Sequence, residues 1–371
     1  MSPGDLSFGI VGCGQVVQEL HLPAWQAVPN VKLVSLCDSS QDAIDKALKQ
    51  APGARGFISL EDFLDHSDDL SFIVLATPGI THPKLVELIL ARSIPLLCEK
   101  PLALTAEEAA SMCLKAEERG VMLTAIHNYR WKENTRRALN LMRAGRLGEI
   151  VAANLKFRSG SLFEECGTWR RMERENRTLL FESGIHFVDI AMMFLGQLKS
   201  LQFVDADRDT LGLQRVIFGT LHEGGARGVF DLMIDASSCA TELEVLGESE
   251  GLSLQFFPPG LRRLPRRDTP LHRGLAEGRR LIAYARDVLG DKLLRPKCSH
   301  RARSHSELFA AFAKAVRGEG PNPLPARDIL PTIQLLDDVA EGSYRPIFEH
   351  SGNRSRQTAA ADEPSSIKST D

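Results

Sequence analysis

The sequence predicts an α/β protein of two domains. The first is a doubly wound parallel sheet with helices on both faces, and the second is an α+β domain with a large, mostly antiparallel open sheet. Three observations support this. Apolar runs alternate with helical patterns over residues 5–126, a glycine-rich turn follows the first run, and strand-like runs joined by short turns dominate from about residue 150. The length of 371 residues also exceeds one typical domain.

The first domain is expected over residues 1–126. Strands that are apolar throughout are typical of parallel sheets with both faces buried. Thr105 and Glu108 form a capping-box pattern at one helix start. Strands are expected at 6–11, 31–37, 71–76, 94–98 and 121–126, and helices at 15–28, 40–50, 81–92 and 105–119.

The glycine-rich turn has the form Gly12-x-Gly14 and opens a helix at Gln15 and Val16. Free backbone N–H groups at such a helix start can bind a pyrophosphate. Asp38 ends the second apolar run, 24 positions after Gly14, where a ribose-binding carboxylate is expected. The pattern indicates a Rossmann dinucleotide site, and an ordinary glycine-rich turn is the alternative.

Two further segments, 76–79 and 98–101, follow apolar runs at the same predicted sheet edge. Ligands of doubly wound sheets bind beyond the carboxyl ends of the strands. Lys100 would lie there beside the nicotinamide, where a lysine can have a lowered pKa and can donate a hydrogen bond to a substrate hydroxyl. A surface lysine before a proline is the alternative.

Glu182, His186 and Asp189 are spaced i, i+4 and i+7, which predicts one shared face of a helix over 181–195. An imidazole held by a carboxylate suits proton transfer from an alcohol as hydride leaves. A histidine satisfied within the core is the alternative. No further ligand cluster in the sequence supports a metal site, so no metal is expected.

Two aromatic and basic segments lie near this predicted cleft, 127–131 (His-Asn-Tyr-Arg-Trp) and 168–171 (Thr-Trp-Arg-Arg). Aromatic, amide and guanidinium groups suit a polyhydroxylated or anionic ligand. Packing of the tryptophans between the domains is an equally good account. The candidate substrate-binding residues in these segments are Asn128, Arg130, Trp169 and Arg170.

The second domain is expected over residues 127–350, with helices on one face of its sheet. An exposed second face would favour self-association, so a homo-oligomer, a dimer or a tetramer, is expected. The polar tail 351–371 is expected to be disordered. Strands are expected at 150–157, 200–206, 212–221, 226–234, 240–247 and 251–257, and later helices at 305–317 and 326–341.

Residues 258–303 are expected as a basic helical insertion. From Arg262 to Arg303, 13 Lys and Arg residues stand against 4 Asp and Glu, and apolar residues recur near one helical face. Three interpretations remain open. They are packing over the sheet or a neighbouring subunit, docking of an anionic ligand or partner at 262–303, and binding to a membrane surface.

Composition favours a protein of the cytoplasm. The formal net charge of −3 gives the whole molecule no bias toward nucleic acid or membranes, so neither is an expected partner. No apolar run approaches the length of a membrane span, and the N-terminus has no signal-peptide pattern. The seven scattered cysteines lack a Cys-x-x-Cys pair, which is typical of a reduced, intracellular chain.

Four segments, in this order, resemble the Gfo/Idh/MocA family, the glucose-fructose oxidoreductase and inositol dehydrogenase group. The resemblance covers roughly residues 1–345. It implies a Rossmann domain, a C-terminal α/β domain, and NAD(P)-dependent oxidation or reduction at a secondary alcohol. The four segments are Gly9-Ile-Val-Gly-Cys-Gly14, Ala76-Thr-Pro78 with His82, Cys98-Glu-Lys-Pro-Leu102, and Gly184-x-His186-x-x-Asp189.

The resemblance also implies residue roles. Lys100 would contact the reacting oxygen, His186 would be the acid/base, and Glu182, where the family usually has Asp, would support His186. Residues 176–178 depart from the glycine-rich run of the family. Contacts to the cofactor are expected from Gly12, Gly14, Gln15, Val16, Asp38, Thr77, Pro78, His82, Glu99 and Lys100. Contacts to the substrate are expected from Lys100, Asn128, Arg130, Trp169, Arg170, His186 and Asp189.

The leading hypothesis is a cytoplasmic dehydrogenase or reductase that uses NAD(P) and acts on a sugar, a cyclitol or a related secondary alcohol. Asp38 is followed by two serines and not by an arginine that would meet a 2′-phosphate, which favours NAD over NADP. Two other hypotheses remain. One is a glycosidase that oxidises its substrate transiently with bound NAD, and the other is a dinucleotide-sensing regulator without catalysis.

Overall fold

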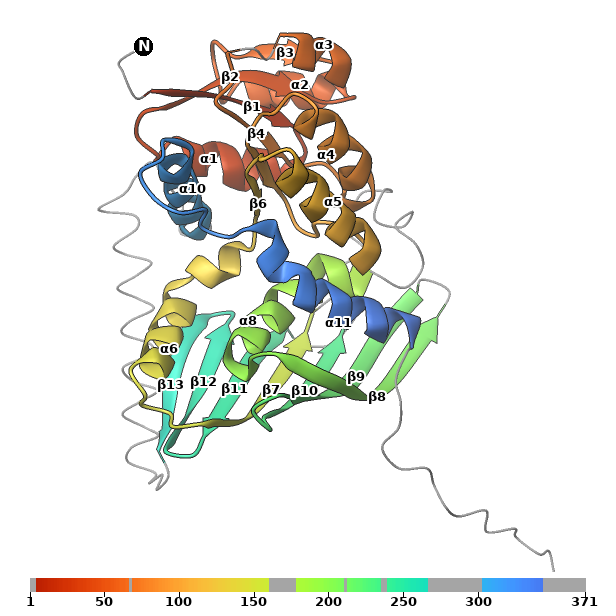
Figure 1. The fold of residues 1–371 in the computed structure, drawn as a ribbon, viewed down its shortest axis with the longest axis vertical. Helices are drawn as coiled ribbons and strands as arrows, with labels where there is room; N and C mark the ends of the chain where they lie inside the picture. Colours follow the sequence, from red (N-terminus) through yellow and green to blue (C-terminus); the bar gives the residue numbers. More distant parts are fainter. Residues whose placement is uncertain are drawn as a thin grey trace, which may run out of the picture.

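The computed structural model describes residues 5–66, 69–159, 178–209, 212–234, 239–265 and 302–342. Figure 1 shows two sheets arranged along the long axis of the molecule, with helices between them. One sheet is parallel and the other is mostly antiparallel. The predicted fold class is therefore confirmed.

The first sheet has six parallel strands in the order β3-β2-β1-β4-β5-β6. The chain starts in the middle of the sheet and winds outward in both directions, which is the doubly wound arrangement. The apolar pattern does not predict β3, because its three residues form no apolar run. The strands are β1 Leu6–Val11, β2 Val31–Cys37, β3 Arg55–Phe57, β4 Phe72–Leu75, β5 Leu96–Cys98 and β6 Leu123–Ala125.

Helices connect these strands. Three of the helices begin at a hydroxyl side chain, of Ser40, Ser59 or Thr105, that accepts a backbone N–H from the first turn. The cap at Thr105 confirms that predicted helix start. The helices are η1 Val17–His21, α1 Leu22–Trp25, α2 Gln41–Leu48, α3 Leu60–Asp65, η2 Gly79–Thr81, α4 His82–Leu90 and α5 Ala106–Glu118.

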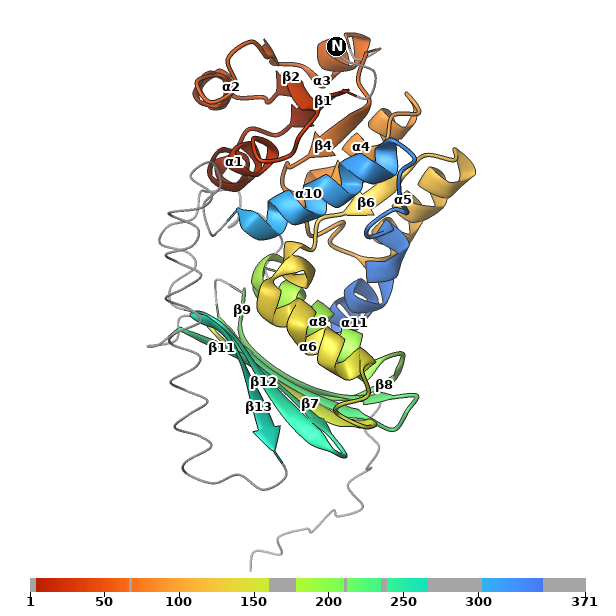
Figure 2. The same ribbon diagram turned by 90° about the vertical axis from the view of Figure 1, so that its left-hand side faces the viewer.

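Alternate residues of the central strands face opposite helical layers. Phe72 of β4 packs with α1, α2 and α10 (Arg303–Val316), whereas the next residue, Ile73, packs with α3, α4 and α5. Figure 2 shows α1 beside α10, and the rings of Trp25 and Phe309 stack between them at 4.4 Å. Both faces of the sheet are therefore buried, as the apolar strands predict.

The second sheet has seven strands in the order β13-β12-β11-β7-β10-β9-β8. Only the central pair, β7 and β10, is parallel, and the other neighbours are antiparallel. The strands are β7 Ile150–Arg158, β8 Leu198–Asp209, β9 Gly212–His222, β10 Arg227–Met233, β11 Ala240–Gly247, β12 Glu250–Phe256 and β13 Pro259–Pro265.

Helices cover one face of the second sheet (Figure 1 and Figure 2). The other face exposes large apolar side chains, and no helix of the described residues lies over it. These exposed side chains are Val151, Phe203, Val229 and Leu246. The covering elements are η3 Asn128–Trp131, α6 Glu133–Arg143, η4 Thr178–Gly184, α8 Ile185–Leu195, η5 Ala326–Ile329 and α11 Leu330–Glu341.

The segment 258–303 differs from its prediction as a basic helical insertion. Its first part forms β13, which pairs with β12 at the edge of the sheet. Arg262 and Arg263 lie on this strand, and Arg263 pairs with Glu250. Charged side chains are typical of edge strands and hide the strand signal in the sequence. Residues 266–301, like the tail 351–371, lie outside the described residues.

Helix α10 follows the second sheet in the sequence but packs on the first. Phe309 and Phe312 lie in the same apolar cluster as Phe8 and Phe72. The chain therefore crosses back after the second sheet. The division into domains 1–126 and 127–350 stays a prediction. It assigns α10 to the second domain, although this helix packs on the first sheet.

Arg130 joins the two sheets. It lies in η3, directly after β6, and donates two hydrogen bonds to Asp189 of α8, from Nε to Oδ2 at 2.7 Å and from Nη2 to Oδ1 at 2.6 Å. His127 Nδ1 lies 3.1 Å from the same Oδ2. Burial alone would raise the pKa of Asp189, but the charges of Arg130 and His127 outweigh it and hold that pKa well below its usual range.

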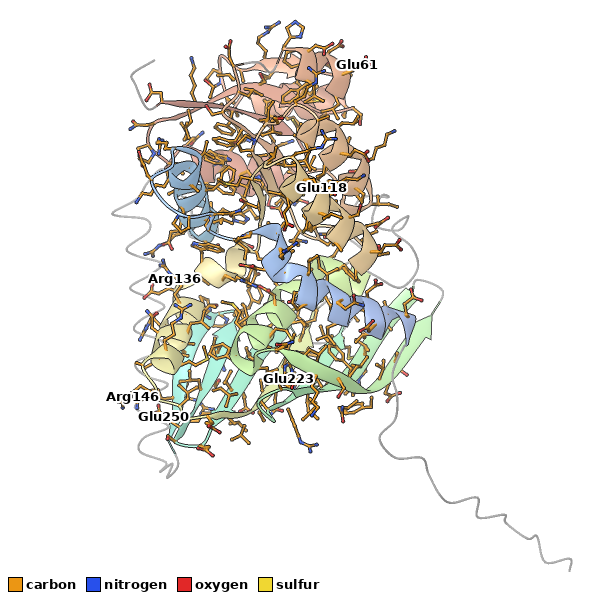
Figure 3. All side chains as sticks on the ribbon, viewed as in Figure 1. Glu61, Glu118, Arg136, Arg146, Glu223 and Glu250 are labelled. Atoms are coloured by element: carbon orange, nitrogen blue, oxygen red, sulfur yellow. The ribbon has the colours of Figure 1, made fainter. Side chains whose placement is uncertain are left out.

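Outside the open sheet face, single apolar side chains such as Ile58 and Leu114 are exposed among charged ones. Charged side chains such as Glu61 and Glu118 point outward from the helices of the first domain (Figure 3). Every helix of the described part is too short or too polar to cross a membrane. None of the five cysteines in that part forms a disulfide.

We expect Arg130→Met to lower the free energy of unfolding by about 3–5 kcal/mol, because Asp189 would stay buried without its partner. Arg137→Met is the matched control, since Arg137 is exposed on α6 and its nearest carboxylate oxygen, on Glu133, is as far as 4.0 Å from Nη1. Its cost should stay below about 0.5 kcal/mol. Urea unfolding followed by circular dichroism measures both. The difference in unfolding free energy between the wild type and Arg130→Met should shrink below about pH 4, because Asp189 becomes protonated in the variant. If Arg130→Met and Arg137→Met lowered the free energy of unfolding equally, the stabilising role of the Arg130–Asp189 pair would be contradicted.

Candidate active site

The glycine-rich turn lies at the carboxyl edge of the first sheet. Gly12 has a φ of +96°, and a Cβ on it would lie 2.5 Å from the carbonyl oxygen of Ala76, so only glycine fits. Gly14 is different, because a Cβ built there meets no atom within 4 Å. This open space leaves room for a pyrophosphate beside the backbone N–H groups of Gln15 and Val16.

Asp38 is fixed beside this turn by two backbone groups. Its Oδ2 accepts the N–H of Cys13 at 2.7 Å, and its Oδ1 accepts the N–H of Ser40 at 2.8 Å. The side chain stays half-buried. A carboxylate has further lone pairs to accept ribose hydroxyl groups. The residues at this edge therefore fit a dinucleotide.

His82 connects the loops after β4 and β5. Its Nε2 lies 2.9 Å from the carbonyl oxygen of Thr77, and its Nδ1 lies 2.8 Å from that of Pro101. Thr77 and Pro78 are partly exposed at the edge, whereas His82 is buried. The sequence predicts a cofactor contact for His82. The structure corrects this, because both ring nitrogens face main-chain carbonyls behind the loops.

Glu99 also lies behind the edge. Its Oε1 is 2.7 Å from His21 Nε2, and its Oε2 accepts the N–H of Lys100 at 2.9 Å. Burial alone would raise its pKa, but the hydrogen bond and charge of His21 outweigh this and lower the pKa to about 2. The predicted cofactor contact is corrected here too, because the buried carboxylate holds His21 and the main chain of Lys100.

His21, Glu99 and His305 offer three ligand atoms within 4.8 Å of one another. A metal-ligating histidine normally donates its second N–H to a partner. The Nδ1 of His21 is buried and has no hydrogen-bond partner in the described part of the chain. Burial, with the charge of His21, lowers the pKa of His305 to about 3, so this ring is neutral. We therefore interpret the trio as a buried polar network.

Lys100 reaches from the loop after β5 to η4. Its Nζ donates to the carbonyl oxygen of Glu182 at 2.8 Å and pairs with Glu182 Oε2 at 3.0 Å. The predicted support of His186 by Glu182 is replaced by this pair. The i, i+4 prediction assumes an α-helix, but Glu182 lies in a π-helical turn, which changes the face it occupies.

His186 lies in the first turn of α8, and the ring of Tyr129 stacks on it at 4.5 Å with an interplanar angle of 24°. Its Nδ1 is buried without a hydrogen-bond partner among the described residues. Burial, and next the charge of Lys100, lower the pKa of His186 well below its usual value. The imidazole is therefore neutral near pH 7 and can accept a proton.

Several residues predicted to bind substrate form hydrogen bonds or ion pairs with other residues of the protein. The amide of Asn128 donates to Ser304 Oγ at 3.1 Å, and Arg130 and Asp189 bind each other. These polar groups are used internally, which indicates a supporting role, and their contact with substrate stays a prediction. Trp169 and Arg170 lie outside the described residues.

Sequence reasoning missed an aromatic ring that contacts His186 and a lysine that contacts that ring. Tyr129 belongs to the segment 127–131 but is not among the predicted site residues, although it stacks on His186. Lys132 follows that segment, and its Nζ lies 4.2 Å from the centroid of the Tyr129 ring. The aromatic segment itself is the signal that would have identified both.

Two family models match the chain. The NAD-binding Rossmann-fold domain of the GFO_IDH_MocA oxidoreductase family matches residues 6–127, and the GFO/IDH/MocA C-terminal domain matches residues 135–253. The first match covers the glycine turn, Asp38 and Lys100, and the second covers His186. NAD binding is thus a property of the family to which the N-terminal domain belongs.

Two curated relatives align over about half to two thirds of their own length. D-apiose dehydrogenase of Paraburkholderia graminis is 28% identical over 65% of this chain and 64% of its own. Glucose-6-phosphate 3-dehydrogenase of Bacillus subtilis is 29% identical over 49% of this chain and 51% of its own.

A solved structure shows the same fold over nearly the whole chain. The WlbA dehydrogenase of Bordetella pertussis, determined with NADH and UDP-GlcNAcA, superposes with a TM-score of 0.74 at 20% identity. The superposition covers 92% of this chain and 96% of the other. With both of its domain models matched in order, this chain belongs to the Gfo/Idh/MocA oxidoreductase family.

Proposed function

We propose that this protein is an NAD-dependent dehydrogenase or reductase that acts on a secondary alcohol or ketone of a sugar, a cyclitol or a sugar-derived substrate. One observation carries the proposal. Lys100, at the carboxyl end of a strand of the first sheet, binds Glu182 just before the helix that presents His186. Relatives named for D-apiose and glucose 6-phosphate support a sugar-like substrate.

The side chains divide the chemistry as follows. NAD, when bound at the glycine turn, accepts or supplies the hydride. Lys100 donates a hydrogen bond to the substrate oxygen, and the carboxylate of Glu182 keeps the ammonium oriented. His186 takes the hydroxyl proton during oxidation and returns it during reduction. Tyr129 fixes the plane of the imidazole by stacking on it.

The open face of the second sheet supports self-association. Val151, Phe203 and Val229 expose apolar surface on it, and exposed apolar patches on a folded protein are typical of interfaces. We therefore retain the homo-oligomer, a dimer or a tetramer, as part of the proposal. The oligomeric state in solution can be measured by light scattering.

We expect His186→Ala and Lys100→Met each to lower kcat by about 10²–10⁴-fold, because each removes a group that acts on the reacting oxygen. NADH binding by His186→Ala should stay unchanged, as measured by fluorescence titration. Lys115→Met is the matched control, since Lys115 is an exposed lysine on α5 that pairs with Glu87. The kcat of oxidation by the wild type, measured at saturating substrate, should stay constant from about pH 8 to about pH 6, because the pKa of His186 lies below 6.5.

Full turnover by either variant would contradict these roles. Cleavage of glycosides without added cofactor, together with stoichiometric NAD released on denaturation, would favour the NAD-dependent glycosidase. NADH binding without turnover of any sugar or cyclitol would favour the dinucleotide-sensing regulator.

The two glycines of the turn should respond differently to alanine. Gly14→Ala should weaken NADH binding at least about tenfold with little change in thermal stability, because the added methyl group enters only the open space. Gly12→Ala should cost more than about 1 kcal/mol of stability, because of its positive φ and the 2.5 Å contact. Calorimetry measures both quantities. Unchanged NADH binding by Gly14→Ala would contradict the placement of the pyrophosphate.

We expect NADPH to bind at least about tenfold more weakly than NADH. The carboxylate of Asp38 is held by Cys13 and Ser40, so it remains beside the ribose and repels a 2′-phosphate. Asp38→Asn should reduce the difference, whereas Asp42→Asn, at an exposed aspartate on α2 paired with Lys46, should not. Equal affinities in the wild type would show that the turn does not select NAD.

A further inference from the structure

Lys100, Arg130 and Lys132 are three basic side chains of the candidate site and its immediate neighbours, and two of them are neutralised. Lys100 pairs with Glu182 at 3.0 Å. Arg130 forms two hydrogen bonds with Asp189. Within the part of the chain that the structure describes, no carboxylate lies within ion-pair distance of the third, Lys132. Its positive charge is therefore not balanced by these residues.

Lys132 is held among aromatic rings. It is the residue before α6, with φ −64° and ψ 140°, and its side chain is half-buried. The Nζ lies 4.2 Å from the centroid of Tyr129 and 5.7 Å from that of Phe257. Aromatic faces attract an ammonium group. This attraction fixes the position of the charge, and no residue that the structure describes accepts a hydrogen bond from the ammonium.

Two observations connect this ammonium to the reaction site. The ring beneath it, Tyr129, stacks directly on His186 at 4.5 Å. The charges of Lys132 and Lys100 also act on the same buried ring, and both contribute to the lowered pKa of His305. Lys132 is therefore connected to His186 through the ring of Tyr129, and both lysines lie close enough to the His305 ring for their charges to act on it.

Desolvation distinguishes Lys132 from an ordinary surface lysine. An exposed ammonium needs no partner, because water solvates it. Burial lowers the pKa of Lys132 to about 8, so its charge is poorly hydrated. An anionic oxygen placed against the Nζ would restore the missing interaction, as charge-assisted hydrogen bonds do.

We propose that Lys132 is a substrate-binding residue that selects sugars carrying an anionic group, a carboxylate or a phosphate, over neutral sugars. The inference rests on the proposed function and names its substrate class. Lys100 and His186 act on the hydroxyl that reacts, and Lys132 holds the charged group of the same substrate beside Tyr129. The aromatic contacts set the position of the ammonium, and the substrate supplies its counter-charge.

The test compares three probes on NADH-saturated protein: D-glucose, D-glucuronate and D-glucose 6-phosphate. Isothermal titration calorimetry gives their affinities, and NAD(H) absorbance gives kcat/KM where turnover occurs. We expect the wild type to bind at least one anionic probe about 10- to 100-fold more tightly than glucose. The arm that shows the preference identifies the group as a carboxylate or a phosphate.

Lys132→Met should abolish this preference, whereas Lys132→Arg should retain most of it. Lys115→Met, the exposed control, should behave as the wild type. Three outcomes would overturn the inference. They are equal affinity for neutral and anionic probes, no binding of either anion, and a preference for anions that survives in Lys132→Met. If anions bind through Lys132 but no probe exchanges hydride with NAD(H), the proposed function fails and the binding site stands.

Discussion

A buried ion pair between Arg130 and Asp189 fixes how the two halves of the site lie relative to each other. Arg130 follows the last strand of the first sheet, and Asp189 lies on α8, which covers the second sheet. A bidentate guanidinium–carboxylate pair restricts both distance and orientation. Lys100 follows the neighbouring strand β5, and His186 lies one helical turn before Asp189. The pair thus sets the separation of the two side chains on which the chemistry depends.

The residues at the edge of the first sheet differ in burial. Gly14, Lys100 and His186 lie where a ligand can reach them. His82 and Glu99 are buried one layer deeper, where they hold the loops that carry Thr77 and Lys100. Only the distances and the burial separate contact from support.

Local signals in the sequence predict much of this molecule. The parallel sheet is predictable because each strand is a separate apolar run, and Gly12 is predictable because a tight turn excludes a side chain. Lys100 and His186 are predictable from their short motifs. The partner of Asp189 is not, because Arg130 lies 59 positions away in the sequence.

Other features escape sequence reasoning for physical reasons. The π-helical turn at 178–184 changes the face occupied by Glu182, and nothing in its composition marks it as π-helical. Helix α6 has few apolar residues, so no long apolar run marks it, although these residues gather on one helical face. The edge strand β13 is hidden by its arginines. Lys132 becomes visible only when Tyr129 and Phe257 are seen to enclose it.

The return of α10 to the first sheet has a consequence for synthesis of the chain. Phe309 and Phe312 complete a layer whose other members, such as Phe8 and Trp25, are near the N-terminus. Domains generally fold as units while the chain leaves the ribosome. Here the nucleotide-binding half is translated first, yet it lacks part of its apolar cover until residues 303–316 have emerged. The two halves therefore reach their finished state together, and the N-terminal half has to keep an apolar surface shielded through most of translation.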